Sequence, residues 1–227
     1  MLAAMKLKAL TLALLLALAA CKPAPNSGPT PSAVPAADRA TGADIHATGP
    51  FDFFLLNLSW SPEFCHSHPE AAECARHNTF VLHGLWPQNN DGSFPQLCDN
   101  DPGPDPAQFS DIYPEPSLLE HEWRTHGTCS GLTATGYFAA ARTGWRSIAI
   151  PAQLAHLDSQ ISMPPDQLAG LFTESNPHLP REAIAISCGR NYLTAVQICL
   201  DKSLHPIACP ATVRSCRANS IRITPPR

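Results

Sequence analysis

Apolar residues gather in short runs near the start and the end of the folded part of the chain, and these runs predict strands. "FDFFLLNLSWS" at 51–61 is aromatic and aliphatic with proline on both sides, which is typical of a buried strand. "TFVLHGLWP" predicts a second strand that ends at Pro87. After Arg181, "AIAISC", "YLTAVQICLD" and "ATVRSCRANSIRI" predict three more, the last two joined by a proline-containing loop.

The middle of the chain predicts helices. Ser117 followed three residues later by Glu120 has the form of a capping box, which predicts a helix over 118–126. "TATGYFAAARTGWRSI" predicts another from about Thr135, and the proline-led "PAQL" and "PPDQLAGLFTESNP" predict two more. Residues 88–116 predict a loop, since Asn, Asp, Gly and Pro recur throughout. This order of elements predicts an α+β fold with a central, mainly antiparallel sheet and helices packed on one side.

The first fifty residues predict targeting and linker segments, with the folded domain at 51–227. Lys6 and Lys8 precede an apolar run at 9–20 that is too short to span a membrane, which indicates an export signal over 1–20. The run ends in "LAAC", which looks like a bacterial lipobox with a lipidated Cys21. An ordinary cleaved signal followed by a stray cysteine is the alternative. Residues 21–50 are rich in Pro and Ala and predict a linker.

These features predict an exported, periplasmic protein that is tethered through Cys21. Lys22, the residue after Cys21, favours sorting to the outer membrane rather than retention at the inner one.

The cysteine count supports this compartment. Nine cysteines are present, and removing Cys21 leaves eight, an even number that predicts four disulfides in an oxidising environment. No CxxC pair occurs, which disfavours a structural zinc site. Eight cysteines allow 105 pairings, so the sequence alone selects none.

The net charge limits how the chain meets a nucleic acid. Without the signal segment it carries 13 basic and 19 acidic residues, a formal charge of −6. Proteins that coat nucleic acid usually have a basic face. Any action on nucleic acid would therefore use a compact site that grips few phosphates. Ten histidines gain charge below about pH 6.5, which favours mildly acidic conditions.

The stretch "LLEHEWRTHGTC" at 118–129 carries candidate chemistry. His121 and His126 flank Glu122 in a near match to the zinc pattern HExxH, with one residue too many. Histidines five apart lie about 140° from each other on a helix, which disfavours a shared metal ion. Glu122 and His126 are four apart and share a face. A carboxylate there orients the imidazole and raises its basicity.

A second imidazole is expected for acid–base chemistry, and His83 in "VLHGLWPQN" is the candidate. It lies at the predicted end of a strand, and Gly84 beside it allows a ligand to approach closely. Trp86 offers a flat face for stacking a nucleobase. Taken singly, a surface histidine and a core tryptophan are the commoner interpretations. Together, two histidines, a carboxylate and a tryptophan favour a general acid–base pair with a stacking platform.

Three segments resemble the signature segments of the ribonuclease T2 family, which includes bacterial periplasmic ribonuclease I and plant self-incompatibility ribonucleases. They are "FLLNLSWSPEFC", "HGLWPQNNDGSFPQLC" and "HEWRTHGTC". The resemblance covers about 51–222 in order, and it includes the cysteines. It implies the pairs Cys65–Cys74, Cys98–Cys129, Cys188–Cys216 and Cys199–Cys209.

The resemblance implies an endoribonuclease that needs neither metal nor cofactor. It would cleave single-stranded RNA by attack of the 2′-hydroxyl on the adjacent phosphorus, giving a 2′,3′-cyclic phosphate that is then hydrolysed to a 3′-phosphate. Such a displacement needs a base for the 2′-hydroxyl, an acid for the leaving 5′-oxygen and donors around the phosphoryl oxygens. DNA lacks the 2′-hydroxyl and should not be cut.

Residue roles follow from motif position in the same resemblance. His126 would be the base and His83 the acid, with Glu122 assisting at the phosphoryl oxygens. The phosphate would be bound by His121 and Arg124, and the base by Trp86, Gln88 and Phe94.

The sequence departs from the family pattern in two respects. Thr125 stands where many members carry lysine, and Arg124 points about 100° elsewhere on a helix. Gln88 and Phe94 stand where relatives have Asp and Tyr. An amide both donates and accepts hydrogen bonds, so base preference does not transfer. Two other classes stay open: a T2 fold that binds RNA or protein without turnover, and a secreted disulfide-rich binding module. We expect a monomer.

Overall fold

The computed structural model describes residues 45–76 and 78–226. The predicted signal segment, Cys21 and most of the predicted linker lie outside these residues. The last six linker residues belong to the folded unit, because Ala47 is fully buried and its N–H donates to the Lys202 carbonyl. Gly49 similarly donates to the carbonyl of Ser130. No helix among the described residues is long and apolar enough to cross a membrane.

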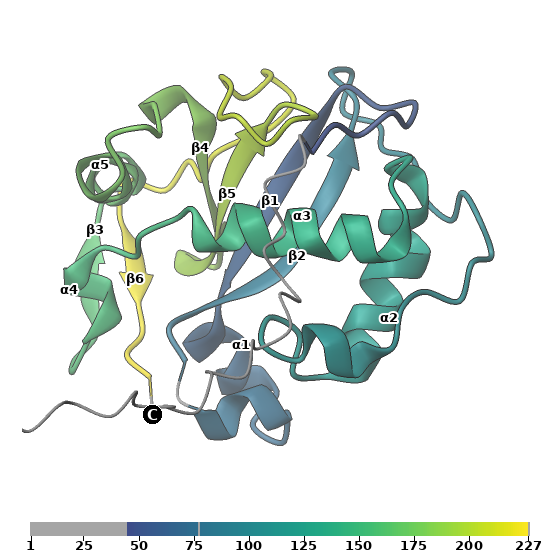
Figure 1. The fold of residues 1–227 in the computed structure, drawn as a ribbon. Coiled ribbons are helices and arrows are strands. Elements are labelled where there is room, and N and C mark those ends of the chain that lie inside the picture. The colour runs from purple at the N-terminus through teal and green to yellow at the C-terminus, as the bar shows by residue number, and fades with distance from the viewer. Residues whose placement is uncertain (1–44, 77, 227) are drawn as a thin grey trace, which may run out of the picture. The chain divides into compact units, whose positions relative to one another are not determined.

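Within the described residues, six strands form one sheet (Figure 1) in the order β2-β1-β5-β6-β3, with β4 also paired to β5. All pairs are antiparallel except β5 with β6, which confirms a mainly antiparallel sheet. The strands are β1 Phe53–Trp60, β2 Phe80–Gln88, β3 Ile161–Met163, β4 Ile184–Gly189, β5 Tyr192–Leu200 and β6 Ile221–Ile223.

Helices cover one face of this sheet, as expected. The predicted helices are α2 Pro116–Thr125, α3 Ala134–Arg146, α4 Ala152–Ala155 and α5 Pro165–Ser175, while α1 Ser61–Ser67 was not anticipated. Figure 1 shows α3 running across β1 and β2. Even-numbered β1 residues such as Leu56 and Leu58 point into the core with Phe138 of α3 and Phe172 of α5. This alternation is what half-buried strands require.

The opposite face of the sheet is covered by the chain after β5. Phe53, Leu55 and Cys199 form a small second cluster with Ile207 and Val213. The sequence expectation of a long strand over 211–223 is wrong, because only Ile221–Ile223 pairs. Disulfides hold the segment instead, with Cys199–Cys209 and Cys188–Cys216 tying it back to β5 and β4.

Helix α2 begins two residues earlier than predicted. Pro116 occupies its first position, where a missing N–H costs nothing, and Glu115 precedes it without a side-chain cap. Ser117 therefore lies inside the first turn, and the capping box predicted from Ser117 and Glu120 does not form.

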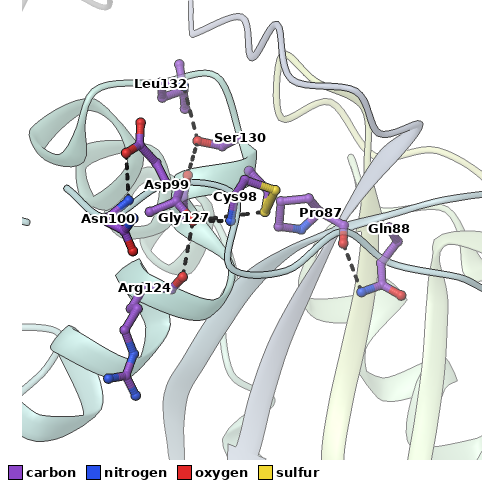
Figure 2. Close-up of a disulfide and its surroundings, with 11 residues drawn as sticks. Pro87, Gln88, Cys98, Asp99, Asn100, Arg124, Gly127, Ser130 and Leu132 are labelled. Atoms are coloured by element: carbon purple, nitrogen blue, oxygen red, sulfur yellow. Dashed lines mark hydrogen bonds between the residues drawn. A yellow bond between two sulfur atoms is a disulfide. The ribbon is translucent and has the colours of Figure 1, made fainter.

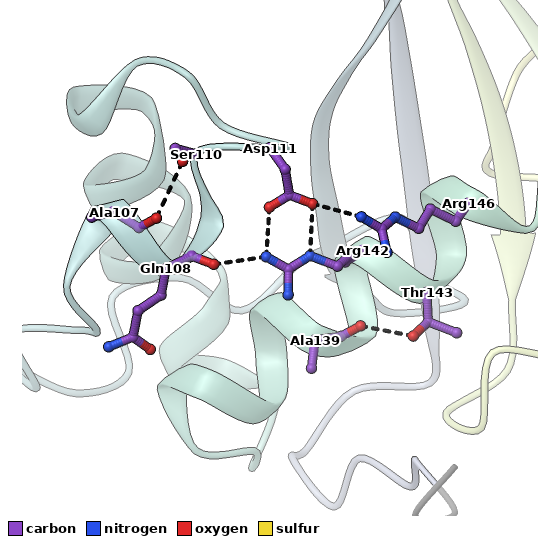
Figure 3. Close-up of polar contacts among 8 residues, drawn as sticks. All are labelled: Ala107, Gln108, Ser110, Asp111, Ala139, Arg142, Thr143 and Arg146. Carbon is purple, nitrogen blue, oxygen red and sulfur yellow. Dashed lines mark hydrogen bonds and ion pairs between the residues drawn. The ribbon is translucent and has the colours of Figure 1, made fainter. Parts of the chain in front are cut away.

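The loop before α2 is fastened to α3 by an ion-pair network (Figure 3). Arg142 pairs with both carboxylate oxygens of Asp111 and donates to the Gln108 carbonyl, while its guanidinium lies 4.6 Å from the ring centroid of Phe109. Arg146 adds a 2.9 Å contact to Asp111. These contacts hold the chain that leads into α2.

All four disulfide pairs implied by the family resemblance are present. Cys98–Cys129 joins the long loop after β2 to the turn that follows α2 (Figure 2). Two hydrogen bonds run beside it, from Leu97 N to the Thr125 carbonyl and from Cys98 N to Thr128 Oγ1.

We expect replacement of Cys98 and Cys129 by serine to lower the free energy of unfolding by about 3–4 kcal/mol, as chain entropy predicts for this loop length. Cys188 and Cys216 make a matched control, since the sequence separations are 31 and 28. Urea unfolding should show similar losses in the free energy of unfolding for the two double-serine variants. Amide hydrogen exchange at Leu97 should accelerate only in the first variant, and equal acceleration in both would contradict the local role of Cys98–Cys129.

Candidate active site

A β-bulge in β2 places His83. Gly84 pairs with Asn57 and Leu82 pairs with Leu58, so His83 has no partner on β1. The extra residue reverses the alternation of side chains along the strand. Leu82 and Leu85, three apart, therefore both face the core, and His83 and Trp86 both face the other side. The strand ends at Gln88, one residue beyond the predicted end at Pro87, so His83 lies within the strand rather than at its end.

Glu122 lies on the buried face of α2, between the apolar Leu119 and Trp123. Its side chain is 0% exposed. Trp86 Nε1 donates to Glu122 Oε2 at 2.8 Å, and Glu122 Oε1 lies 3.7 Å from His83 Nε2 with no hydrogen-bond partner. This contact joins α2 to β2 at the position of the bulge.

Gly84 permits that contact. A Cβ on Gly84 would lie 2.1 Å from Glu122 Oε2 and 2.2 Å from Trp86 Nε1. The sequence predicts that Gly84 admits a ligand. The close approach belongs to Glu122 and Trp86 instead.

His126 is the residue after the last helical one, with φ −118° and ψ −48°. The indole of Trp86 is a neighbour of both imidazoles, with its ring centroid 5.4 Å from those of His83 and of His126. The two histidine rings are thus at most twice that distance apart. His121 joins the group, its ring centroid 6.3 Å from that of His126.

Burial sets the charge states of this cluster. It raises the pKa of Glu122 to about 8, although the Trp86 hydrogen bond opposes the rise. Burial also lowers the pKa of His126 to about 4, with contributions from the charges of His121 and His83. The pKa of His83 is lowered by burial and then by His121. At pH 5, Glu122 is therefore neutral and His126 is an unprotonated imidazole.

The same residues are the ones that could hold a metal ion. Ligand atoms of His121, Glu122 and His126 all lie within 4.8 Å of one another. The helical spacing predicted that His121 and His126 point apart, which is wrong because His126 lies past the end of the helix. A neutral, buried Glu122 with one oxygen bonded to Trp86 is nevertheless a poor ligand, since metals bind deprotonated carboxylates.

The remaining predicted residues lie around this centre. His121 and Arg124 are exposed on α2 and line a hollow of about 320 Å³. His121 also lines a hollow of about 410 Å³ beside His83. Its apolar walls are Phe64, Val81 and Leu118, none of which the sequence analysis selected.

The predicted base-binding residues lie beyond Trp86. Gln88 lines a hollow of about 180 Å³ at the end of β2, and its amide donates to the adjacent Pro87 carbonyl (Figure 2). Phe94 is 49% exposed in the following loop. The described structure thus groups His83, Glu122 and His126 around the indole of Trp86 and leaves Gln88, Phe94 and Arg124 outside this group.

Comparison with known proteins shows which family the chain resembles. The Ribonuclease T2 family model matches residues 51–209. A ribonuclease of Aeromonas hydrophila is 47% identical over 89 residues, which are 37% of this chain and 40% of that protein. A probable ribonuclease of Haemophilus influenzae is 32% identical over 184 residues, 72% of this chain and 63% of that one. The chain thus spans less than two thirds of each of these relatives.

A solved structure shares the fold. The RNase-related protein from Calystegia sepium matches with a TM-score of 0.63 at 24% identity, covering 78% of this chain and 98% of that one. The family match extends over most of the chain and includes every residue of the His83–Glu122–His126 group. The chain belongs to the ribonuclease T2 family.

We expect Gly84→Ala to separate Trp86 from Glu122 and to lower the free energy of unfolding by about 1–3 kcal/mol, as overpacking does. Gly170→Ala is the matched control, because a Cβ on Gly170 of α5 meets nothing within 4 Å. That change should be neutral or stabilise by about 0.5–1 kcal/mol. Thermal unfolding compares the two. A Gly84→Ala protein as stable as the control would contradict the contact.

Proposed function

We propose that this chain is an endoribonuclease that cleaves single-stranded RNA through a 2′,3′-cyclic phosphate to 3′-phosphate ends. The supporting observation is that the Trp86 ring centroid lies 5.4 Å from those of both His83 and His126, while its indole N–H donates to the Glu122 carboxyl. Family membership supports the same activity class. Two imidazoles this close can contact opposite sides of one phosphodiester, as an in-line displacement requires.

The electrostatics favour one assignment of roles. A general base must be unprotonated and a general acid protonated at the same pH, so the base needs the lower pKa. Because the pKa of His126 is about 4, it is unprotonated over most of the acidic range. His126 therefore takes the 2′-hydroxyl proton, and His83 protonates the leaving 5′-oxygen. The roles reverse when water attacks the cyclic phosphate.

Glu122 assists as a hydrogen-bond donor. With a pKa of about 8, its carboxyl is neutral at acidic pH and does not repel a phosphate. Oε2 accepts from Trp86, so the proton belongs on Oε1, the atom nearer to His83. A buried donor aimed at a developing charge is an effective stabiliser of a transition state. His121, on the exposed side of α2, provides a further donor to the phosphate, and no lysine at Thr125 is then required.

The hollow beside His83 and the hollow at Gln88 suggest how the RNA strand is oriented in the site. If His83 serves the leaving group, the downstream nucleotide lies in the hollow lined by Phe64, Val81 and Leu118. The upstream base then lies toward Gln88 and Phe94.

The export signal extends this proposal to a periplasmic enzyme with a lipid anchor at Cys21. Incorporation of a fatty-acid analogue tests the anchor, and an unlabelled mature protein would reject it.

Single-stranded RNA digestion in excess chelator tests the activity. The wild-type protein should cleave RNA, leave DNA intact and yield cyclic phosphate ends, with activity unchanged by EDTA because no step uses a metal. His126→Ala and His83→Ala should each lose at least about a hundredfold in rate, the usual contribution of a general acid or base. Activity that EDTA abolishes would instead favour the metal grouping of His121, Glu122 and His126. RNA binding without cleavage would favour the alternative of an inactive T2 fold.

The pH dependence of kcat/KM tests the roles. This parameter reports the free enzyme. As the pH is raised, kcat/KM should increase when His126 loses its proton near pH 4. It should decrease again when His83 loses its proton, and this decrease should begin at a pH below 6.5 because burial lowers the pKa of His83. The charged or titratable groups that face His83 are Glu122 and His121 of α2, His126, and Glu73 and Glu115 at the edge of the hollow. A maximum above pH 7 would contradict this assignment.

A further inference from the structure

A chain of polar side chains crosses the outer face of the sheet and ends on His83. Gln197 of β5 donates from Nε2 to Asn57 Oδ1 of β1 at 3.0 Å. Asn57 Nδ2 lies 3.5 Å from Ser59 Oγ, the long end of the range for a hydrogen bond. Ser59 Oγ in turn lies 3.1 Å from His83 Nδ1. The bulge that directs His83 away from the core also directs it toward Ser59.

The order of donors in this chain fixes where protons lie. Asn57 is only 4% exposed, so its amide must be satisfied within the protein. Its oxygen accepts from Gln197, and Ser59 Oγ is the acceptor available to its nitrogen among the described residues. Ser59 then uses a lone pair toward Asn57 and has its hydroxyl hydrogen free for His83 Nδ1.

We propose that Ser59 is a positioning residue for His83, which holds the ring with Nε2 toward the scissile phosphate and keeps the unprotonated imidazole as the Nε2–H tautomer in the free protein. This inference rests on the proposed function. Nothing in the sequence motifs assigns Ser59, Asn57 or Gln197 such a role.

A hydroxyl suits this position because it can both donate and accept. Toward the unprotonated ring, Ser59 donates to Nδ1. Toward the imidazolium, it accepts from Nδ1–H while Nε2–H faces the leaving oxygen. When Nε2 gives up its proton, Nδ1–H stays bonded to Ser59, so the ring need not turn during the transfer. A fixed carboxylate could only accept and would raise the pKa of the ring.

The test measures the tautomer and the rate of the full-length protein. Nitrogen-15 chemical shifts of His83 at a pH where it is unprotonated should show the proton on Nε2 in the wild type. Ser59→Ala should give a mixture of tautomers and lower kcat about ten- to a hundredfold with KM nearly unchanged, the loss expected from a misdirected catalytic group. Ser59→Thr keeps the hydroxyl and should restore both readouts.

Ser187→Ala is the matched control. Ser187 accepts from Thr194 at 2.9 Å in the same sheet, and no contact joins it to His83. It should retain the wild-type tautomer and rate. A wild-type proton on Nδ1, full activity of Ser59→Ala or failure of Ser59→Thr to recover would overturn the role of Ser59. These results leave the proposed function standing, whereas full RNA cleavage by His83→Ala defeats the function itself.

Discussion

The architecture of the site depends on one buried hydrogen bond, from the indole of Trp86 to the carboxyl of Glu122. It joins a strand to a helix that lie far apart in the sequence, and it forms because Gly84 has no side chain to prevent it. Outside this bond, the Cys98–Cys129 disulfide and the Asp111 network hold the segments on either side of α2. Without the bond, the two imidazoles would share no fixed neighbour.

Burial, rather than a metal ion or a cluster of cations, sets the charge states of Glu122 and His126. It keeps Glu122 neutral and His126 unprotonated in acid, because desolvation penalises the charged form of each. Residues 21–227 carry a formal charge of −6, so the proposed function gains no attraction of RNA from net positive charge. In the proposed mechanism, a site made of neutral donors and one imidazolium tolerates an anionic substrate while it contacts few phosphates. Under the proposed function, RNA binding therefore depends on local contacts in the site rather than on the net charge of the protein.

Periodicity predicted the strands β1, β2, β4 and β5 and the helices after residue 115, and the family resemblance implied every disulfide pair. What they missed depends on local departures from regular geometry. A strand pattern cannot show a bulge, so the shared direction of His83 and Trp86 was not predictable from alternation. Likewise, the angle predicted between His121 and His126 assumed a helix that continues through His126, whereas α2 ends one residue earlier, at Thr125. No sequence pattern pointed to Ser59, because its proposed role depends on a contact with His83 that forms only when β1 and β2 pair.

The most direct test of the central claim is the crystal structure of the full-length protein with a 2′-deoxy dinucleotide, whose phosphate binds but is not cleaved because the attacking hydroxyl is absent. Its phosphate should lie between the rings, with one oxygen within about 3 Å of His83 Nε2 and the 2′-carbon directed at His126. A phosphate bound against one ring only, or through a metal ion on His121, would contradict it.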